Sequence, residues 1–182
     1  MRYILTLMVI LLLLSACSNS NEESELHLDS SPLIIAAEEN DINKIRSLLN
    51  DGINVNETDD CQWTALMKAA LYGHREIAEL LLEHGARVDL VDSGGYTAML
   101  LAASNNHQAL VTALLDKGAS INHQEQTRGW TALIWAAKRG HTEVVRLLLE
   151  KNADKNVTDH SGKTALSWAK ESQKPEIVTL LQ

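Results

Sequence analysis

Apolar residues in this chain gather in two kinds of segment that alternate from about residue 31 onward. The first kind begins at a Ser or Thr and continues with Leu, Met and paired alanines, as in "TALMKAA" at 64–70. The second kind is rich in leucine and mixes polar residues on a helical period, as in "REIAELLL" at 75–82. Apolar positions spaced at i, i+3 and i+4 indicate amphipathic helices. The pattern therefore predicts short helices that occur in pairs.

These paired segments recur at a nearly constant spacing. They start at Ser31, Thr64, Thr97, Thr131 and Thr164, so the intervals are 33, 33, 34 and 33 residues. Such a period is typical of a solenoid in which each unit packs on its neighbours. A hydroxyl at each start can cap the first helix. The residues expected just past the second helices favour the left-handed conformation; they are Gly52, Gly85, Gly118 and Asn152.

The turns and loops resemble those of the ankyrin-repeat family. The motifs that carry the resemblance are "GYTAM", "GWTAL" and "GKTAL", and the longer "RGHTEVVRLLLEKNADKN" at 139–156. The resemblance covers residues 30–182 and implies an all-α solenoid of about five helix–turn–helix units with short hairpin turns. The implied units are 30–59, 60–92, 93–125, 126–159 and 160–182.

Two turns depart from the regular pattern. Gln62 stands where three other repeats have Gly, so we expect a strained or reshaped turn before Thr64. The interval of 34 residues places one extra residue within "NHQEQTRGW", which lengthens the loop into the fourth repeat. The first and last units are also atypical, as expected for the ends of a solenoid.

The N-terminal segment predicts export and lipidation. One positive charge, at Arg2, precedes an apolar run at 4–14, which is too short to span a bilayer and fits a secretory signal. The following "LSAC" resembles a bacterial lipobox, which implies that residues 1–16 are removed and that Cys17 receives a diacylglycerol on its sulfur. Ser18 resembles the outer-membrane pattern of Gram-negative lipoproteins, facing the periplasm. Because lipidation would consume Cys17, we expect no disulfide with Cys61.

Charge and composition narrow the classes of partner. The formal net charge is −8, and the acidic, glycine-free segment 18–29 is interpreted as a tether next to the lipidated Cys17. An acidic chain without a basic run is a poor nucleic-acid binder, because such binding depends on Lys and Arg neutralising phosphates. We therefore expect a protein partner and a lipid anchor, with no nucleic acid and no small-molecule substrate.

No residue pattern predicts catalysis, a cofactor or a metal site. "SGKT" at 161–164 resembles the end of a phosphate-binding loop, but Val157 stands where that loop needs Gly. His74, His107 and His141 recur at one repeat position. Stacked helices lie about 8–10 Å apart, which is too far for these histidines to share a metal ion. The family resemblance implies that they hold the loop between the paired helices.

The resemblance implies a concave binding face made of the hairpin tips and first helices. The residues that the resemblance assigns to this face are Trp63, Tyr72, Tyr96, Arg128, Trp130, Lys138, Arg139 and Lys163. Aromatic side chains are favoured at interface hot spots because they bury much area at low entropy cost. We expect Trp63, Tyr96 and Trp130 to form a ladder along three fingers, with Trp130 the strongest contact residue. Trp135 and Trp168 are expected to pack against neighbouring repeats.

The sequence thus favours an envelope-anchored lipoprotein that binds another protein and is not an enzyme. Two alternatives remain at this point. The protein could be an immunity or inhibitor protein against a toxin or enzyme that acts in the periplasm. It could instead be a redox or stress-related accessory that acts through Cys61.

Overall fold

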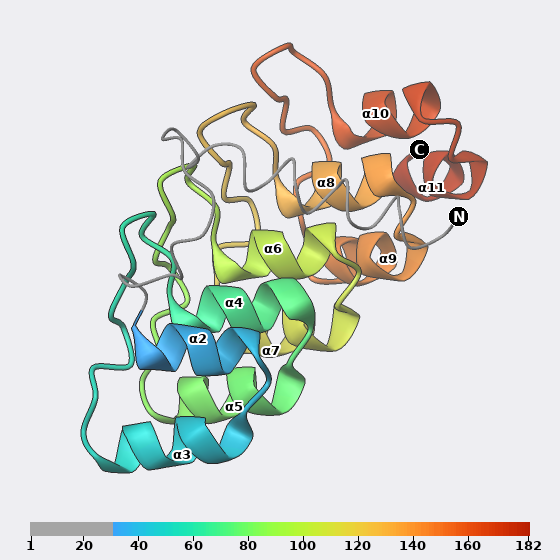
Figure 1. Cartoon of the computed structure of the whole chain (residues 1–182). Coiled ribbons are helices and arrows are strands. Elements are labelled where there is room, and N and C mark those ends of the chain that lie inside the picture. The colour runs from blue at the N-terminus through green and yellow to red at the C-terminus, as the bar shows by residue number, and fades with distance from the viewer. Residues whose placement is uncertain (1–30) are drawn as a thin grey trace, which may run out of the picture.

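The computed structural model describes residues 31–182 and shows a stack of short helices with projecting loops (Figure 1). The described part contains ten helices in five consecutive pairs and no strand. The pairs are α2 (Pro32–Glu38) and α3 (Ile42–Asn50), α4 (Ala65–Tyr72) and α5 (Arg75–Glu83), α6 (Ala98–Ser104) and α7 (Gln108–Asp116), α8 (Ala132–Arg139) and α9 (Thr142–Glu150), and α10 (Ala165–Glu171) and α11 (Pro175–Leu181). The expected five helix–turn–helix units are confirmed.

The first helices of the pairs stack on one another as an inner row, from α2 through α4, α6 and α8 to α10. The second helices form an outer row beside them, from α3 to α11. Each helix has only seven to nine residues, and helices of that length are unstable alone in water. Stability therefore comes from stacking, and the paired alanines of the inner row are buried where neighbouring helices meet.

Each inner helix begins at the hydroxyl residue that the sequence pattern marks. The side chains of these N-cap residues accept a hydrogen bond from a backbone N–H of the first turn, and the caps are Ser31, Thr64, Thr97, Thr131 and Thr164. The residues predicted just past the outer helices all have positive φ; they are Gly52, Gly85, Gly118 and Asn152. Both sets of helix boundaries could thus be predicted from the sequence.

The loops between the pairs form four fingers, which project to one side of the inner row (Figure 1). In three of them an Asp carboxylate accepts two backbone N–H groups of its own turn, as Asp92 does from Gly94 and Tyr96 at 2.9 and 2.8 Å. Asp59 and Asp159 do the same in their fingers. Gln62 has φ +64° at the turn where the other fingers have Gly, which confirms the expected strain.

The finger between α7 and α8, which leads into the fourth unit, has Glu125 in place of Asp. Its carboxylate, 1% exposed, accepts the backbone N–H groups of Thr127, Arg128 and Trp130 at 2.6, 2.9 and 3.0 Å. Trp130 follows Glu125 by five residues, whereas the equivalent residue follows Asp by four in the other fingers. The additional CH₂ of Glu lets the carboxylate reach across the extra residue. The irregular interval is accommodated by a longer side chain.

Histidines hold consecutive units together. The Nε2–H groups of His74, His107 and His141 donate to the carbonyls of Glu38, Leu71 and Ser104, each in the preceding unit, at 3.2, 3.1 and 3.0 Å. This confirms a structural role for the histidine row.

The predicted signal at 1–16, Cys17 and the tether lie outside the described residues, so the structure does not test them. Within 31–182, no helix is both long and apolar enough to cross a membrane.

Candidate functional site

The predicted binding residues lie in two groups on the inner helices and fingers. Trp63 and Tyr72 lie near the joint between the first and second units. The other six belong to, or lie against, a row of four aromatic rings that runs from the third unit to the fifth. Ring centroids are 6.3 Å apart for Tyr96 and Trp135, 4.5 Å for Trp135 and Trp130, and 5.0 Å for Trp130 and Trp168. We call these four residues the aromatic cluster.

Trp130 does not stand exposed at a finger, contrary to the sequence-based expectation. Its side chain is 2% exposed, and its ring lies edge-on against both Trp135 of α8 and Trp168 of α10. Its indole N–H donates to Asp159 Oδ2 at 2.9 Å. The expectation that Trp130 offers free area to a partner is wrong, because neighbouring rings already cover it. Rings also do not follow one another directly from Tyr96 to Trp130, since Trp135 lies between them.

The two remaining tryptophans differ in exposure. Trp135 is 5% exposed and packs against Tyr96 of the preceding unit, which agrees with the expected contact to a neighbouring repeat. Its buried indole N–H has no hydrogen-bond acceptor among the described residues. Trp168, which sequence reasoning assigned to packing, is half-buried and keeps part of its surface open. The accessible tryptophan of the cluster is therefore Trp168, and the packing tryptophans are Trp130 and Trp135.

Asp159 joins the last finger, between α9 and α10, to the aromatic cluster. This carboxylate is 6% exposed and accepts the indole N–H groups of Trp130 and Trp168 at 2.9 and 2.8 Å. It also accepts from Ser161 and from the backbone of Lys163. Burial alone would raise the pKa of Asp159, but these hydrogen bonds outweigh it and hold the pKa well below its usual range. Sequence reasoning missed the role of Asp159 as acceptor for two indoles.

Four cationic side chains lie over the rings of the aromatic cluster. Lys138 Nζ is 4.5 Å from the ring centroid of Trp130 and 4.0 Å from that of Trp168. Lys163 Nζ lies 4.4 Å from Trp168. The guanidinium carbons of Arg128 and Arg139 each lie 4.8 Å from a ring, those of Trp130 and Trp135 respectively. We call Arg128, Lys138, Arg139 and Lys163 the cation cluster. Each contact is of the kind that contributes about 0.5–1 kcal/mol at an exposed site.

The cation cluster is only partly neutralised. Lys163 Nζ pairs with Glu171 at 2.5 Å, and Arg139 donates to the carbonyl of Ser104 at 2.8 Å. Burial and then the nearby charge of Arg128 lower the pKa of Lys138. Glu171 raises this pKa, whereas Lys163 and Arg139 lower it by smaller amounts. A lowered lysine pKa means that the surroundings disfavour an added positive charge.

The joint between the first and second units contains similar residue types in another arrangement. Lys68 Nζ lies 5.1 Å from the ring centroid of Trp63 and pairs with Glu38 at 2.8 Å. The hydroxyl of Tyr72 donates to the same carboxylate at 2.9 Å. Burial, followed by the hydrogen bond and the charge of Glu38, raises the pKa of Tyr72 to about 12. Here a carboxylate on an inner helix neutralises the cation directly.

The remaining candidates offer little chemistry. Within residues 31–182 no group of His, Cys, Asp and Glu is arranged to hold a metal ion. A redox role through Cys61 has no support among the described residues, and the expectation of no disulfide between Cys17 and Cys61 stays a prediction. The other cysteine of the chain, Cys17, lies outside the described residues.

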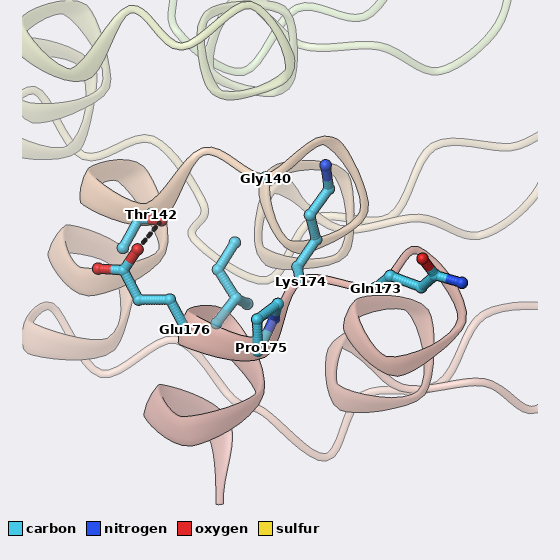
Figure 2. A pocket seen from close by; sticks show the side chains of 7 residues that line it. Gly140, Thr142, Gln173, Lys174, Pro175 and Glu176 are labelled. Carbon is cyan, nitrogen blue, oxygen red and sulfur yellow. Dashed lines mark hydrogen bonds between the residues drawn. The ribbon is translucent and has the colours of Figure 1, made fainter.

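A shallow pocket lies between the helix–helix loops of the last two units (Figure 2). Its lining includes Gly140, Lys174 and Pro175, and Thr142 donates to Glu176 at 3.3 Å across it. Lys174 occupies the position of the inter-unit histidine in the preceding units. The pocket brings together one ammonium and one carboxylate and carries no nucleophile or base poised for a reaction.

Comparison with known families places the chain. The family model for "Ankyrin repeats (3 copies)" matches residues 6–92, 33–125 and 99–182. No curated protein matches the chain. The chain belongs to the ankyrin-repeat family, and its helical solenoid is the fold that this membership implies. Repeats of this kind form scaffolds for protein–protein interaction.

Proposed function

We propose that this protein is an envelope-anchored scaffold that binds another protein through its inner face, which we define as the four fingers and the inner helices α2, α4, α6, α8 and α10. It acts by binding rather than by catalysis. The observation that carries the proposal is the half-buried Trp168 surrounded by cations of the cation cluster. Such a combination of an accessible indole and basic side chains is typical of interface hot spots.

The structure supports this face over the outer row. Side chains from two different kinds of element meet on the inner face, since Lys163 comes from a finger and Lys138 from α8, and both lie against Trp168 of α10. A partner that contacts Trp168 would therefore touch two units at once. Rigid stacking fixes the relative positions of these groups, which reduces the ordering cost of binding.

The membrane anchor is proposed from the sequence. The lipobox-like "LSAC" places Cys17 where a diacylglycerol would be attached through a thioether. A single acyl chain binds membranes only marginally, whereas two or three chains give stable anchoring. Anchoring would concentrate the inner face near the membrane, in the periplasm if the cell is Gram-negative. Inhibition of a toxin or enzyme in that compartment would be a special case of the same docking.

Site-specific crosslinking in the native cell tests the binding face. A photoreactive phenylalanine is placed at Trp168 in the full-length chain and, as a matched control, at the exposed Arg146 on outer helix α9. We expect one adduct of defined mass from position 168 and none from position 146. Equal labelling from both positions, or labelling from the outer row alone, would contradict the proposed face.

Mass analysis of the mature protein from membranes tests the anchor. We expect the N-terminal peptide to begin at Cys17 with the mass of added acyl chains, and Cys17→Ser to abolish both the added mass and membrane retention. Lipidation and disulfide formation compete for the same sulfur, because the chain has two cysteines. A peptide that joins Cys17 to Cys61 through a disulfide would contradict the anchor and leave the proposed binding face unaffected.

A further inference from the structure

We propose that the cation cluster binds an acidic segment of the partner protein, with carboxylates seated between Arg128, Lys138 and Lys163 over the indole of Trp168. The inference rests on the proposed function, because it names the chemistry of the partner that the inner face takes. It concerns the joint between the fourth and fifth units, where α8, α10 and two fingers meet.

The geometry brings the cationic groups to one place. Lys138 Nζ is within 4.5 Å of the ring centroids of both Trp130 and Trp168. Lys163 approaches Trp168 and Arg128 approaches Trp130, at 4.4 and 4.8 Å. Because the two ring centroids are only 5.0 Å apart, the three cations converge on one small surface. Each retains donors for a carboxylate, since Lys has three N–H donors and Arg five.

The anionic groups present are already engaged in other contacts. Asp159 accepts two indole and two backbone N–H groups below the cations. Glu171 pairs with Lys163 and is the one carboxylate in a side-chain ion pair with this cluster among the described residues. Against the three carboxylates of Glu171, Asp159 and Glu125, the four cations still leave one positive charge in excess, on a chain whose formal net charge is −8. An added carboxylate would relieve the repulsion between Lys138 and Arg128.

The type of partner follows from this distribution of charge. A nucleic acid would be repelled by the acidic protein surface outside the cluster. The affinity of a protein for nucleic acid also depends on many phosphate contacts, which one local cluster does not supply. An anionic membrane would face the same repulsion. A short acidic peptide segment needs only the local cluster, and its apolar atoms can lie on the exposed part of Trp168. Electrostatic complementarity of this kind mainly sets specificity and association rate.

The test uses a fluorescein-labelled peptide of alternating Glu and Ala, with the matched Gln–Ala peptide as the neutral probe, and measures anisotropy with the full-length protein. We expect the acidic peptide to bind, the neutral one not to bind, and added salt to weaken binding. The double variant Arg128→Gln with Lys138→Gln should bind the acidic peptide with an affinity about tenfold lower. Lys44→Gln with Lys117→Gln removes the same charge from exposed sites elsewhere and should change affinity by less than about twofold.

Folding is checked by the thermal unfolding midpoint of each variant. If the double variant Arg128→Gln with Lys138→Gln does not fold, Arg128→Gln with Lys163→Gln replaces it. The side chains of Arg128 and Lys163 each lie at the surface of a finger, so replacing them should disturb the fold less. Equal loss of affinity in the cluster and control variants would overturn the inference. Tighter binding of a single-stranded oligonucleotide or of anionic vesicles at the same residues would overturn it too. A crosslink from position 168 without binding of the acidic peptide would reject the acidic partner but retain the proposed function.

Discussion

The first and last inter-unit joints of the inner face use the same types of side chain with opposite electrostatic results. In the first joint, Lys68 and Tyr72 contact Glu38 on inner helix α2. In the last, Glu171 pairs with Lys163 alone, and indole and backbone N–H groups occupy the oxygens of Asp159 on a finger. The cation is therefore neutralised in one joint and left partly uncompensated in the other.

The position of a carboxylate therefore decides what a cluster of aromatic and basic residues can do. Glu38 has a side chain that is 40% exposed and reaches the ammonium of Lys68 directly. Asp159 is buried and acts as a structural acceptor that orders the indoles. Composition alone cannot distinguish the two joints, since both contain Trp or Tyr, Lys and an acid.

The largest expected effect comes from Trp130→Ala. Removing a buried indole leaves a cavity between Trp135 and Trp168 and takes away one of the two indole donors to Asp159 Oδ2, so the free energy of unfolding should fall by about 3–5 kcal/mol. Trp63→Ala at the first joint removes a half-buried ring and should cost less than half as much. Thermal and denaturant unfolding measure both. A nearly unchanged midpoint for Trp130→Ala would show that Trp130 is a surface residue, which the structure contradicts.

The next effect compares the two carboxylates. Asp159→Ala leaves two indole and two backbone N–H groups without their acceptor and should lower the free energy of unfolding by about 2–4 kcal/mol. Glu38→Ala removes a more exposed pair and should cost less than about 1 kcal/mol. Chemical denaturation gives both values. If the two substitutions cost the same, the contrast between a structural acceptor and a neutralising partner fails.

Glu125→Asp is expected to have an intermediate effect on the finger that supports the last joint. The shorter side chain cannot reach the backbone N–H groups of both Thr127 and Trp130 across the extra residue, so we expect a loss of about 1–2 kcal/mol. The reciprocal Asp92→Glu in a finger of regular length serves as the control for an acid of altered length. A Glu125→Asp protein as stable as the parent would mean that the loop does not depend on this reach.

The smallest effect concerns the pH dependence of the first joint. The pKa of Tyr72 rises to about 12 in the folded chain, above the ordinary value near 10 in an unfolded chain. The stabilisation is fully present below about pH 10 and is lost as pH rises through the folded value. Tyr72→Phe should therefore flatten the decline in stability over that interval. An unchanged slope in Tyr72→Phe would contradict this account of the first joint.

The helices, caps and unit boundaries could be predicted because they depend on local, repeating signals. Ser31 and the four repeat threonines cap their helices, and Gly52, Gly85 and Gly118 adopt positive φ, since these properties belong to the residue and its neighbours. Gln62 could also be predicted as a strained turn. The fold is therefore almost fully contained in the periodic pattern.

The candidate site was less predictable because it depends on contacts between units. Trp130 and Trp168 exchange the roles that their repeat positions suggest, since the ring of Trp168 lies against Trp130 and covers it. The role of Glu125 could have been found, because an acid one CH₂ longer than Asp accompanies the one extra residue in its loop. The double hydrogen bond from two indoles to Asp159 has no signal within a single repeat.

The central claim is that the positive charge of the last joint is not neutralised within the molecule. NMR titration of the lysine side chains, with Lys138 assigned by loss of its signal in Lys138→Gln, tests it most directly. We predict that Lys138 titrates below the ordinary lysine value in the free protein, and that a saturating amount of the acidic peptide raises its pKa. A Lys138 that titrates at or above the ordinary value in the free protein, or that does not respond to the peptide, would contradict the account.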